Sequence, residues 1–164
     1  KMADKILCVL AGYDEKTEAR LAALQNRLYE NGFAGTQTRN IPQHITLGTF
    51  SPEEEEALLP RMRQAAGECA PFPVTFNHAG VFGGARVLFI APDISHELLR
   101  LKEHFGPACG WTAHTTMLID EPQTIYQALP LVMEGFSAFA GEVSSLHLFE
   151  FLPTRHILSL PLGG

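Results

Sequence analysis

Two short segments of the chain place a histidine two residues before a threonine: His44-Ile45-Thr46-Leu47 and His114-Thr115-Thr116-Met117. Histidine titrates near neutral pH, with an ordinary pKa of about 6.5. One neutral imidazole can therefore take a proton from a nucleophile while a second, protonated imidazole gives one to a leaving oxygen. Threonine hydroxyls beside them can donate hydrogen bonds to the non-bridging oxygens of a phosphate. A phosphodiester with a water or internal nucleophile suits such a pair of segments, without a metal.

Strand geometry relates the histidine to the threonine within each segment. Side chains of a β-strand alternate between two faces, so His44 and Thr46 share one face and Ile45 lies on the other. The same holds for His114 and Thr116. A polar face must meet water, a ligand or other polar groups, because a buried unpaired polar atom costs about 1–3 kcal/mol. The pattern predicts either one shared polar site or two structural histidines with satisfied hydrogen bonds.

The elements that must position these segments follow from the apolar patterns of the chain. Alternating and short apolar runs predict strands, and apolar residues three or four positions apart predict helices. The resulting order predicts an α+β fold with two similar lobes, in a single domain over residues 1–164. The predicted strands cover 5–13, 44–50, 72–82, 86–92, 111–119, 136–152 and 156–162, and the predicted helices cover 14–32, 51–68, 93–106 and 121–133.

Capping residues and glycines predict several of these boundaries. Gly32 lies where a helix C-terminus favours glycine. Ser51 and Glu54 have the spacing of a capping box at the start of a helix, and Asp120 is expected to cap the last helix. Gly83-Gly84 between two apolar runs predicts a β-hairpin.

Composition and charge limit the partners. The 164 residues are 46% hydrophobic, as in globular proteins, and the formal net charge of -6 disfavours a long nucleic-acid duplex, which needs a basic field. A local pocket can still bind a nucleotide or a short RNA terminus.

Three cysteines without C-x-x-C spacing favour a reducing compartment. The sequence has no zinc-ligand pattern, so we expect no metal and no cofactor. No apolar run approaches the roughly 18 residues of a membrane span. We therefore expect a cytoplasmic monomer without a membrane partner.

The paired segments resemble the two His-x-Thr-x signatures of the 2H phosphoesterase superfamily, and within it the 2′-5′ RNA ligase-like proteins. The resemblance covers nearly the whole chain, including the hairpin segment "GVFGGARVLFIAP" between the signatures. It implies a bilobal α+β fold with two antiparallel sheets related by a pseudo-two-fold axis, helices on the outside and a central cleft. It also implies metal-free cleavage of cyclic phosphodiesters, such as nucleoside or RNA-terminal 2′,3′-cyclic phosphates. Several members also join RNA ends through a 2′-5′ linkage.

Placed on this sequence, the resemblance implies that His44 and His114 are the catalytic acid and base, and that Thr46 and Thr116 bind the phosphate. Which histidine is the base stays open. The alternative function is a non-catalytic module that binds a nucleotide or an RNA end on the same fold. A third hypothesis is a structural domain in which these four side chains satisfy each other.

Other residues are candidate substrate contacts. RNA-ligase-like members often carry an arginine shortly after the second signature, but this chain reads Leu118-Ile119-Asp120 there, which favours small or short substrates. Positive charge would then come from other arginines, and aromatic rings could stack on a base. The candidates are Arg39, Arg86 and Arg155 for charge, and Tyr13, Phe82 and Trp111 for stacking. His147 and His156 in the closing strands are further residues that could approach the cleft.

Overall fold

The computed structural model describes residues 4–164, and within this range the elements follow the predicted order and confirm the α+β class. The first elements are β1 (Ile6–Tyr13), α1 (Glu15–Glu30), β2 (His44–Phe50), the 3₁₀ turn η1 (Pro52–Glu54) and α2 (Glu55–Glu68). The middle of the chain forms β3 (Phe72–Val81), β4 (Val87–Pro92) and α3 (His96–Glu103). The last elements are β5 (Thr115–Ile119), α4 (Pro122–Gly135), β6 (Phe139–Phe151) and β7 (Arg155–Pro161).

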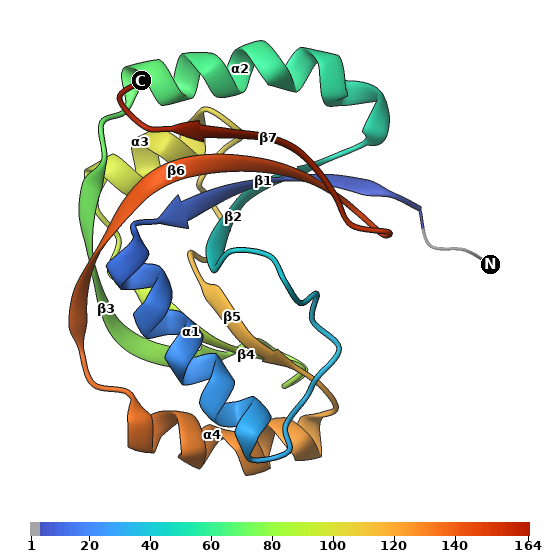
Figure 1. The fold of residues 1–164 in the computed structure, drawn as a ribbon, viewed down its shortest axis with the longest axis vertical. Helices are drawn as coiled ribbons and strands as arrows, with labels where there is room; N and C mark the ends of the chain where they lie inside the picture. The colour runs from blue at the N-terminus through green and yellow to red at the C-terminus, as the bar shows by residue number, and fades with distance from the viewer. Residues whose placement is uncertain (1–3) are drawn as a thin grey trace.

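The seven strands of the described residues form one continuous antiparallel sheet. Its strand order is β2-β1-β6-β3-β4-β5, with β7 added to β6. The long strand β6 joins the two predicted sheets, because residues 139–143 pair with β3 and residues 143–151 pair with β1. The sheet is strongly curved, so that β2 and β5, the edge strands at the two ends of this order, contact each other without closing a barrel (Figure 1). The two signature segments therefore lie at opposite ends of the strand order of one sheet.

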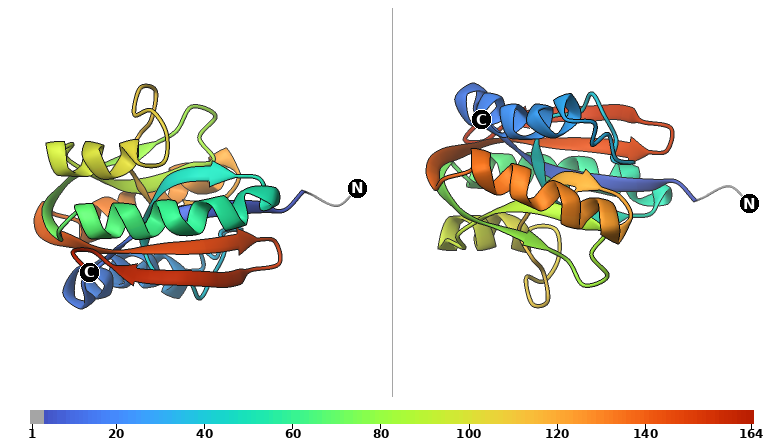
Figure 2. Two further views of the ribbon diagram at one scale, coloured as in Figure 1. Left: turned by 90° about the horizontal axis from the view of Figure 1, so that it is seen from above. Right: turned by 90° about the horizontal axis from the view of Figure 1, so that it is seen from below.

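The helices divide into two pairs that cover different parts of the sheet (Figures 1 and 2). Helix α2 packs on β6 and β7, and α3 contacts β2; with β1 these elements form the first lobe. Helices α1 and α4 pack on each other, α1 also contacts β5, and α4 contacts β4; with β3 they form the second lobe. Helix α1 thus leaves the N-terminal half of the chain and packs on strands of the other half. No helix within residues 4–164 is long and apolar enough to cross a membrane.

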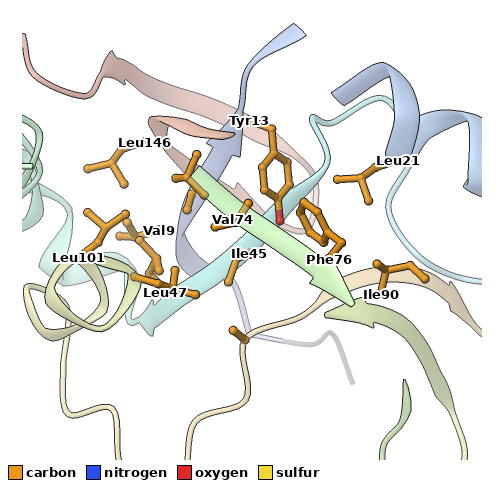
Figure 3. Packing of buried hydrophobic residues seen from close by; sticks show 14 of the residues in the cluster. Val9, Tyr13, Leu21, Ile45, Leu47, Val74, Phe76, Ile90, Leu101 and Leu146 are labelled. Carbon is orange, nitrogen blue, oxygen red and sulfur yellow. The ribbon is translucent and has the colours of Figure 1, made fainter. Parts of the chain in front are cut away.

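A single apolar cluster connects the two lobes. Figure 3 shows side chains from strands and helices of both lobes meeting around Tyr13 and Phe76. Phe76 is fully buried, and its ring centroid lies 4.9 Å from that of Phe139 and 5.5 Å from that of Tyr13. Burial of each such side chain stabilises the fold by about 1.5–3 kcal/mol. The shared core therefore fixes the position of one half of the sheet relative to the other, and with it the positions of β2 and β5.

Most predicted boundaries lie within two residues of those in the structure. The strand predicted from residue 136 begins at Phe139, because α4 runs to Gly135, and three further predictions are corrected. Gly32 follows α1 with φ +87°, and the Ser51–Glu54 capping box is present. Helix α3 is shorter than predicted, because Ser95 caps it by accepting from the Leu98 backbone N–H. The last helix has Glu121 as its N-cap, since Asp120 instead accepts from the Glu121 N–H. The strand predicted over 111–119 begins only at Thr115, so the second signature histidine directly precedes its strand.

Candidate active site

The two signatures have the same pattern of burial. In each, the histidine and the threonine are partly exposed, whereas the residue after each of them is buried. These buried residues are Ile45, Leu47 and Met117 at 0% exposure and Thr115 at 1%. The predicted alternation of faces is therefore confirmed in both segments.

The two histidines are also oriented in the same way. His44 Nδ1 lies 2.8 Å from the carbonyl oxygen of Pro42, and His114 Nδ1 lies 2.9 Å from that of Thr112. A carbonyl oxygen only accepts hydrogen bonds, so Nδ1 carries a hydrogen in both rings. In each case the partner lies two residues before the histidine. Nε2 is therefore the ring nitrogen left for acid–base chemistry in both signatures.

A β-bulge follows the threonine in both signature strands. Leu10 pairs with Thr46 and Val9 with Gly48, which leaves Leu47 as the extra residue of β2. Phe89 pairs with Thr116 and Leu88 with Leu118, which leaves Met117 as the extra residue of β5. A bulge bends its strand and raises the local twist. Equivalent bulges at equivalent positions are independent support for the pseudo-two-fold relation between the signatures.

A cavity of about 240 Å³ lies between the two edge strands. Three of the four signature side chains line it together: His44, Thr46 and Thr116. The fourth, His114, stands beside two phenylalanines, with its ring centroid 4.7 Å from that of Phe82 in an edge-on contact and 5.4 Å from that of Phe89. The other residues around the cavity are Gln25, Gln37, Thr38, Ile41, Pro42, Gln43, Thr115, Ile119 and Phe151.

The environment of His44 favours its neutral form. Burial lowers the pKa of His44 below its ordinary value, the hydrogen bond to the Pro42 carbonyl opposes this, and the charge of His114 lowers the pKa further. Two nearby imidazoles repel each other when both are charged, so a charged His114 disfavours protonation of His44. His44 is therefore the better candidate for a proton acceptor near neutral pH.

Hydrogen bonds hold the two signature segments against each other. The Thr115 hydroxyl lies 3.0 Å from the carbonyl oxygen of His44 and 2.6 Å from the Tyr13 hydroxyl. The carbonyl can only accept, so Thr115 donates to His44 and accepts from Tyr13. In addition, Trp111 Nε1 donates to the carbonyl oxygen of Thr46 at 3.1 Å. Side chains from and beside the second signature thus fix the backbone of the first.

The aromatic candidates have different positions. Tyr13 is 8% exposed and packs edge-on against Phe76, and burial raises its pKa well above the ordinary value. Its ring lies in the core and its hydroxyl is bound to Thr115, so it does not line the cavity; Trp111 is bound to the backbone of Thr46. Phe82 is partly exposed and touches the His114 ring. It remains a candidate contact beside the second histidine.

The three candidate arginines are each engaged outside the cavity. Arg39 stacks its guanidinium 3.9 Å from the Tyr29 ring centroid and donates to the Ala34 carbonyl oxygen. Arg86 forms an ion pair with Glu121 at 3.0 Å. Arg155 forms ion pairs with Glu55 of α2 at 2.6 Å and with Glu150 at 3.1 Å. None of the three arginines lines the cavity, so none of them replaces the missing arginine there. The residues that line the cavity include no charged side chain except His44 when it is protonated.

His147 lies on the sheet beside the first signature. It is on β6 opposite Leu10 of β1, and Leu10 in turn pairs with Thr46. Its Nδ1 lies 2.6 Å from the Ser159 hydroxyl, which is 2.7 Å from His156 Nε2. Burial, and then the charges of His156 and His44, lower the pKa of His147 to about 4. No group of three His, Cys, Asp or Glu within residues 4–164 is placed to hold a metal ion.

This lowered pKa predicts a loss of stability in acid. The unfolded chain binds a proton on His147 below about pH 6.5, whereas the folded protein does not bind it until about pH 4. The free energy of unfolding therefore falls as the pH drops through this window and levels off below it. We expect His147→Gln to reduce the fall in melting temperature between pH 7 and pH 4.5. His96→Gln, at an exposed histidine of α3, is the matched control, and equal slopes for His147→Gln and the wild type would contradict the prediction.

Glutamines around the cavity were missed by sequence reasoning. Gln43 precedes the first signature, Gln25 comes from α1, and Gln37 comes from the connection between α1 and β2. The alternation of faces along a strand does not predict the orientation of a residue just outside that strand. A polar residue within a helix likewise gives no indication of which other element it contacts. Ile41 was missed for the same reason as Gln43, whereas Phe151 lies at the end of β6 and no local pattern indicates that this end reaches the cavity.

A bilobal α+β fold with paired His-x-Thr segments at facing strand edges is that of a 2H phosphoesterase. The sequence profile of the 2′-5′ RNA ligase superfamily matches residues 13–152, and the chain belongs to this family. Family and fold together support a phosphoesterase or 2′-5′ RNA ligase-like enzyme. A search of curated proteins finds no significant match.

Solved structures with the same fold span nearly the whole chain. TT0787 of Thermus thermophilus is 17% identical with a TM-score of 0.66, and the match covers 97% of this chain and 98% of that one. LigT of E. coli in its apo form is 14% identical with a TM-score of 0.61, over 99% of this chain and 100% of that one. E. coli LigT complexed with 3′-AMP is 18% identical with a TM-score of 0.62, over the same shares. At these identities the likeness concerns the fold, and it confirms the predicted fold class.

Proposed function

We propose that this protein hydrolyses 2′,3′-cyclic phosphodiesters of a nucleotide or a short RNA terminus, with His44 and His114 as base and acid. Two observations together carry the proposal: the two histidines are oriented in the same way, and the threonines of both signatures line one cavity. Each histidine is held through Nδ1 by the carbonyl two residues before it, and Thr46 and Thr116 both line the cavity. E. coli LigT has been solved with phosphate and with 3′-AMP, which supports a nucleotide-sized phosphate ester as the ligand here.

The reaction assigns one proton transfer to each histidine. Neutral His44 accepts a proton from water through Nε2, and the oxygen of that water attacks phosphorus. The bond from phosphorus to one ribose oxygen breaks, and His114 donates a proton from Nε2 to that oxygen. The product is a phosphomonoester with a free neighbouring hydroxyl. The same two proton transfers with a ribose hydroxyl of a second RNA end in place of water would give the joining reaction, in which a P–O bond to that hydroxyl forms as one P–O bond of the ring breaks.

The two threonines suit the charge that develops on the phosphate. Each hydroxyl has one hydrogen to donate, and donors fixed on strands need no reorganisation when negative charge builds up on the non-bridging oxygens. In this proposal Thr46 and Thr116 hold the phosphate from the two edge strands, so the reacting phosphorus lies between the two lobes. Both strands are braced against each other by Thr115 and Trp111, which fixes the distance between the donors.

The direct test is turnover of a cyclic nucleotide in the presence of EDTA. Adenosine 2′,3′-cyclic phosphate is incubated with the protein, and the products are identified by ³¹P NMR and by chromatography against the 2′- and 3′-monophosphates. We expect one monophosphate to form, with a rate that EDTA does not lower and that falls at both low and high pH. Tight binding of the nucleotide with no product would replace this proposal with the non-catalytic binding module.

A further inference from the structure

A chain of amide hydrogen bonds runs along the cavity, and the protein backbone sets its direction. Gln25 Nε2 donates to the carbonyl oxygen of Met117 at 3.0 Å. Because a carbonyl only accepts, the amide nitrogen of Gln25 must face Met117, and its side-chain oxygen faces elsewhere. Gln43 Nε2 donates to that oxygen at 2.6 Å. The orientation of both amides is therefore fixed by the backbone of β5.

The free end of this chain is the side-chain oxygen of Gln43. Gln43 is 9% exposed and lines the cavity, and the Glu18 carboxylate holds its backbone N–H at 2.9 and 3.0 Å. Among residues 4–164, the one side-chain polar atom that is both fully buried and without a hydrogen-bond partner is Arg27 Nε. Gln43 Oε1 has no hydrogen-bond partner within the described chain either. Because it is not among the fully buried atoms, it must be accessible. Because Gln43 lines the cavity and its amide is held by Gln25, this oxygen is a fixed acceptor available to a ligand bound there.

The third glutamine of the cavity has no free group of this kind. Gln37 Nε2 donates to the Tyr29 hydroxyl and to the Ala34 carbonyl oxygen, both at 2.9 Å. Its side-chain oxygen accepts from the Ile119 backbone N–H at 2.9 Å. Gln37 therefore secures the connection before β2 to the end of β5. Of the three glutamines, Gln43 is the one left to bind a ligand through its oxygen.

Apolar side chains line the cavity together with these glutamines. Among them are Ile41, Ile119 and Phe151, and the Phe151 ring stacks on Phe149 with centroids 5.9 Å apart and planes at 15°. A nucleobase has two apolar faces and a polar edge, so it suits apolar walls with one directed acceptor. The volume of about 240 Å³ lies below the roughly 300–1,000 Å³ of pockets for drug-sized ligands. The cavity therefore suits a ligand of one base with its phosphate.

We propose that this cavity is a nucleobase subsite in which Gln43, oriented by Gln25, selects a base that carries an exocyclic amino group. The inference rests on the proposed function, which places the cyclic phosphate at His44, Thr46 and Thr116 of the same cavity. The N6 amino group of adenine or the N4 amino group of cytosine donates to Gln43 Oε1. A bound base without the amino group covers this acceptor and leaves it unpaired, and a site built around a hydrogen bond discriminates against such an analogue.

The test compares two substrates that differ in the amino group alone, adenosine 2′,3′-cyclic phosphate and purine riboside 2′,3′-cyclic phosphate. We expect the wild type to prefer the adenosine substrate by about 10-fold or more in kcat/KM. Gln43→Met, which keeps an unbranched side chain but removes the acceptor, should narrow the preference to below about 3-fold. Gln127→Met at an exposed position of α4 is the matched control and should keep the wild-type ratio.

The outcomes separate this inference from the function on which it rests. If neither substrate turns over, the proposed function fails. If the wild type hydrolyses both substrates with equal kcat/KM values, the proposed nucleobase subsite is wrong while the proposed function stands. The same conclusion follows if Gln43→Met keeps the wild-type ratio of the two kcat/KM values. Should Gln43→Met fail to fold, Gln25→Met takes its place, because it frees the Gln43 amide to rotate and should narrow the same ratio. An unchanged ratio in that variant contradicts the amide chain.

Discussion

His44→Ala and His114→Ala are each expected to lower kcat for hydrolysis of adenosine 2′,3′-cyclic phosphate by about 10²–10⁴-fold, the usual contribution of a general acid or base. Each variant leaves the backbone carbonyl partner of its histidine, Pro42 or Thr112, at the surface of the site, where water can replace the lost N–H. The loss should therefore fall on kcat more than on melting temperature. Steady-state kinetics at pH 7, with circular dichroism and thermal melts of the same samples, measure both.

The double variant and a control make this expectation sharper. Groups that act in one step are not additive, so the loss of kcat in the His44→Ala/His114→Ala double variant should be much smaller than the product of the two single losses. His96→Ala, at an exposed histidine on α3, should keep wild-type kinetics. If a folded His114→Ala variant keeps kcat within about 3-fold of the wild type, the proposed acid–base pair is contradicted. A loss of this size lies far below what a general acid or base contributes.

The roles of the two histidines leave different traces in the pH dependence. Burial and the charge of His114 lower the pKa of His44, so a base at this position stays neutral to a lower pH than an ordinary histidine. The acid limb of kcat/KM for the free enzyme should therefore lie below about pH 6.5. In His114→Ala the repulsion between the rings is absent, so the residual acid limb should move upward. This shift distinguishes a coupled pair from two independent histidines.

Local patterns in the sequence predicted much of this site. Alternation along a strand places His44 with Thr46, and His114 with Thr116, whatever the rest of the fold does. The capping box at Ser51 was likewise predictable, because such a box depends on a few neighbouring residues. The faces of the signatures and the order of the elements could therefore be predicted from the sequence alone.

The contacts that complete the site join residues far apart in the chain. Thr115 reaches the His44 carbonyl across 71 positions, and Gln25 reaches Met117 across 92. Neither contact follows from a local period, because it depends on α1 packing on the second lobe and on the curvature that brings β2 to β5. The position of Tyr13 has the same cause: the sequence carries no signal that separates a stacking platform from a core residue whose hydroxyl contacts Thr115.

Thr46→Val and Thr116→Val are each expected to lower kcat by about 10²–10³-fold, the range found when one donor to a developing oxyanion is removed. Valine keeps the β-branched shape that a strand favours and removes the hydroxyl, so the strand and its bulge are preserved while the donor is lost. Both threonines line the same cavity from opposite edge strands. A loss from each variant would therefore place the phosphate between the two lobes.

Serine variants separate a lost hydrogen bond from a changed strand. Thr46→Ser and Thr116→Ser keep the donor and lose a methyl group, so kcat should return to within about 10-fold of the wild type if the hydroxyl carries the effect. Thr75→Val, at an exposed position of β3, is the control for the substitution itself. If serine is as inactive as valine at both positions, the threonines act through packing, and phosphate binding by their hydroxyls is excluded. If only one position responds, the phosphate is held from one edge strand, and the symmetry of the signatures does not extend to the chemistry.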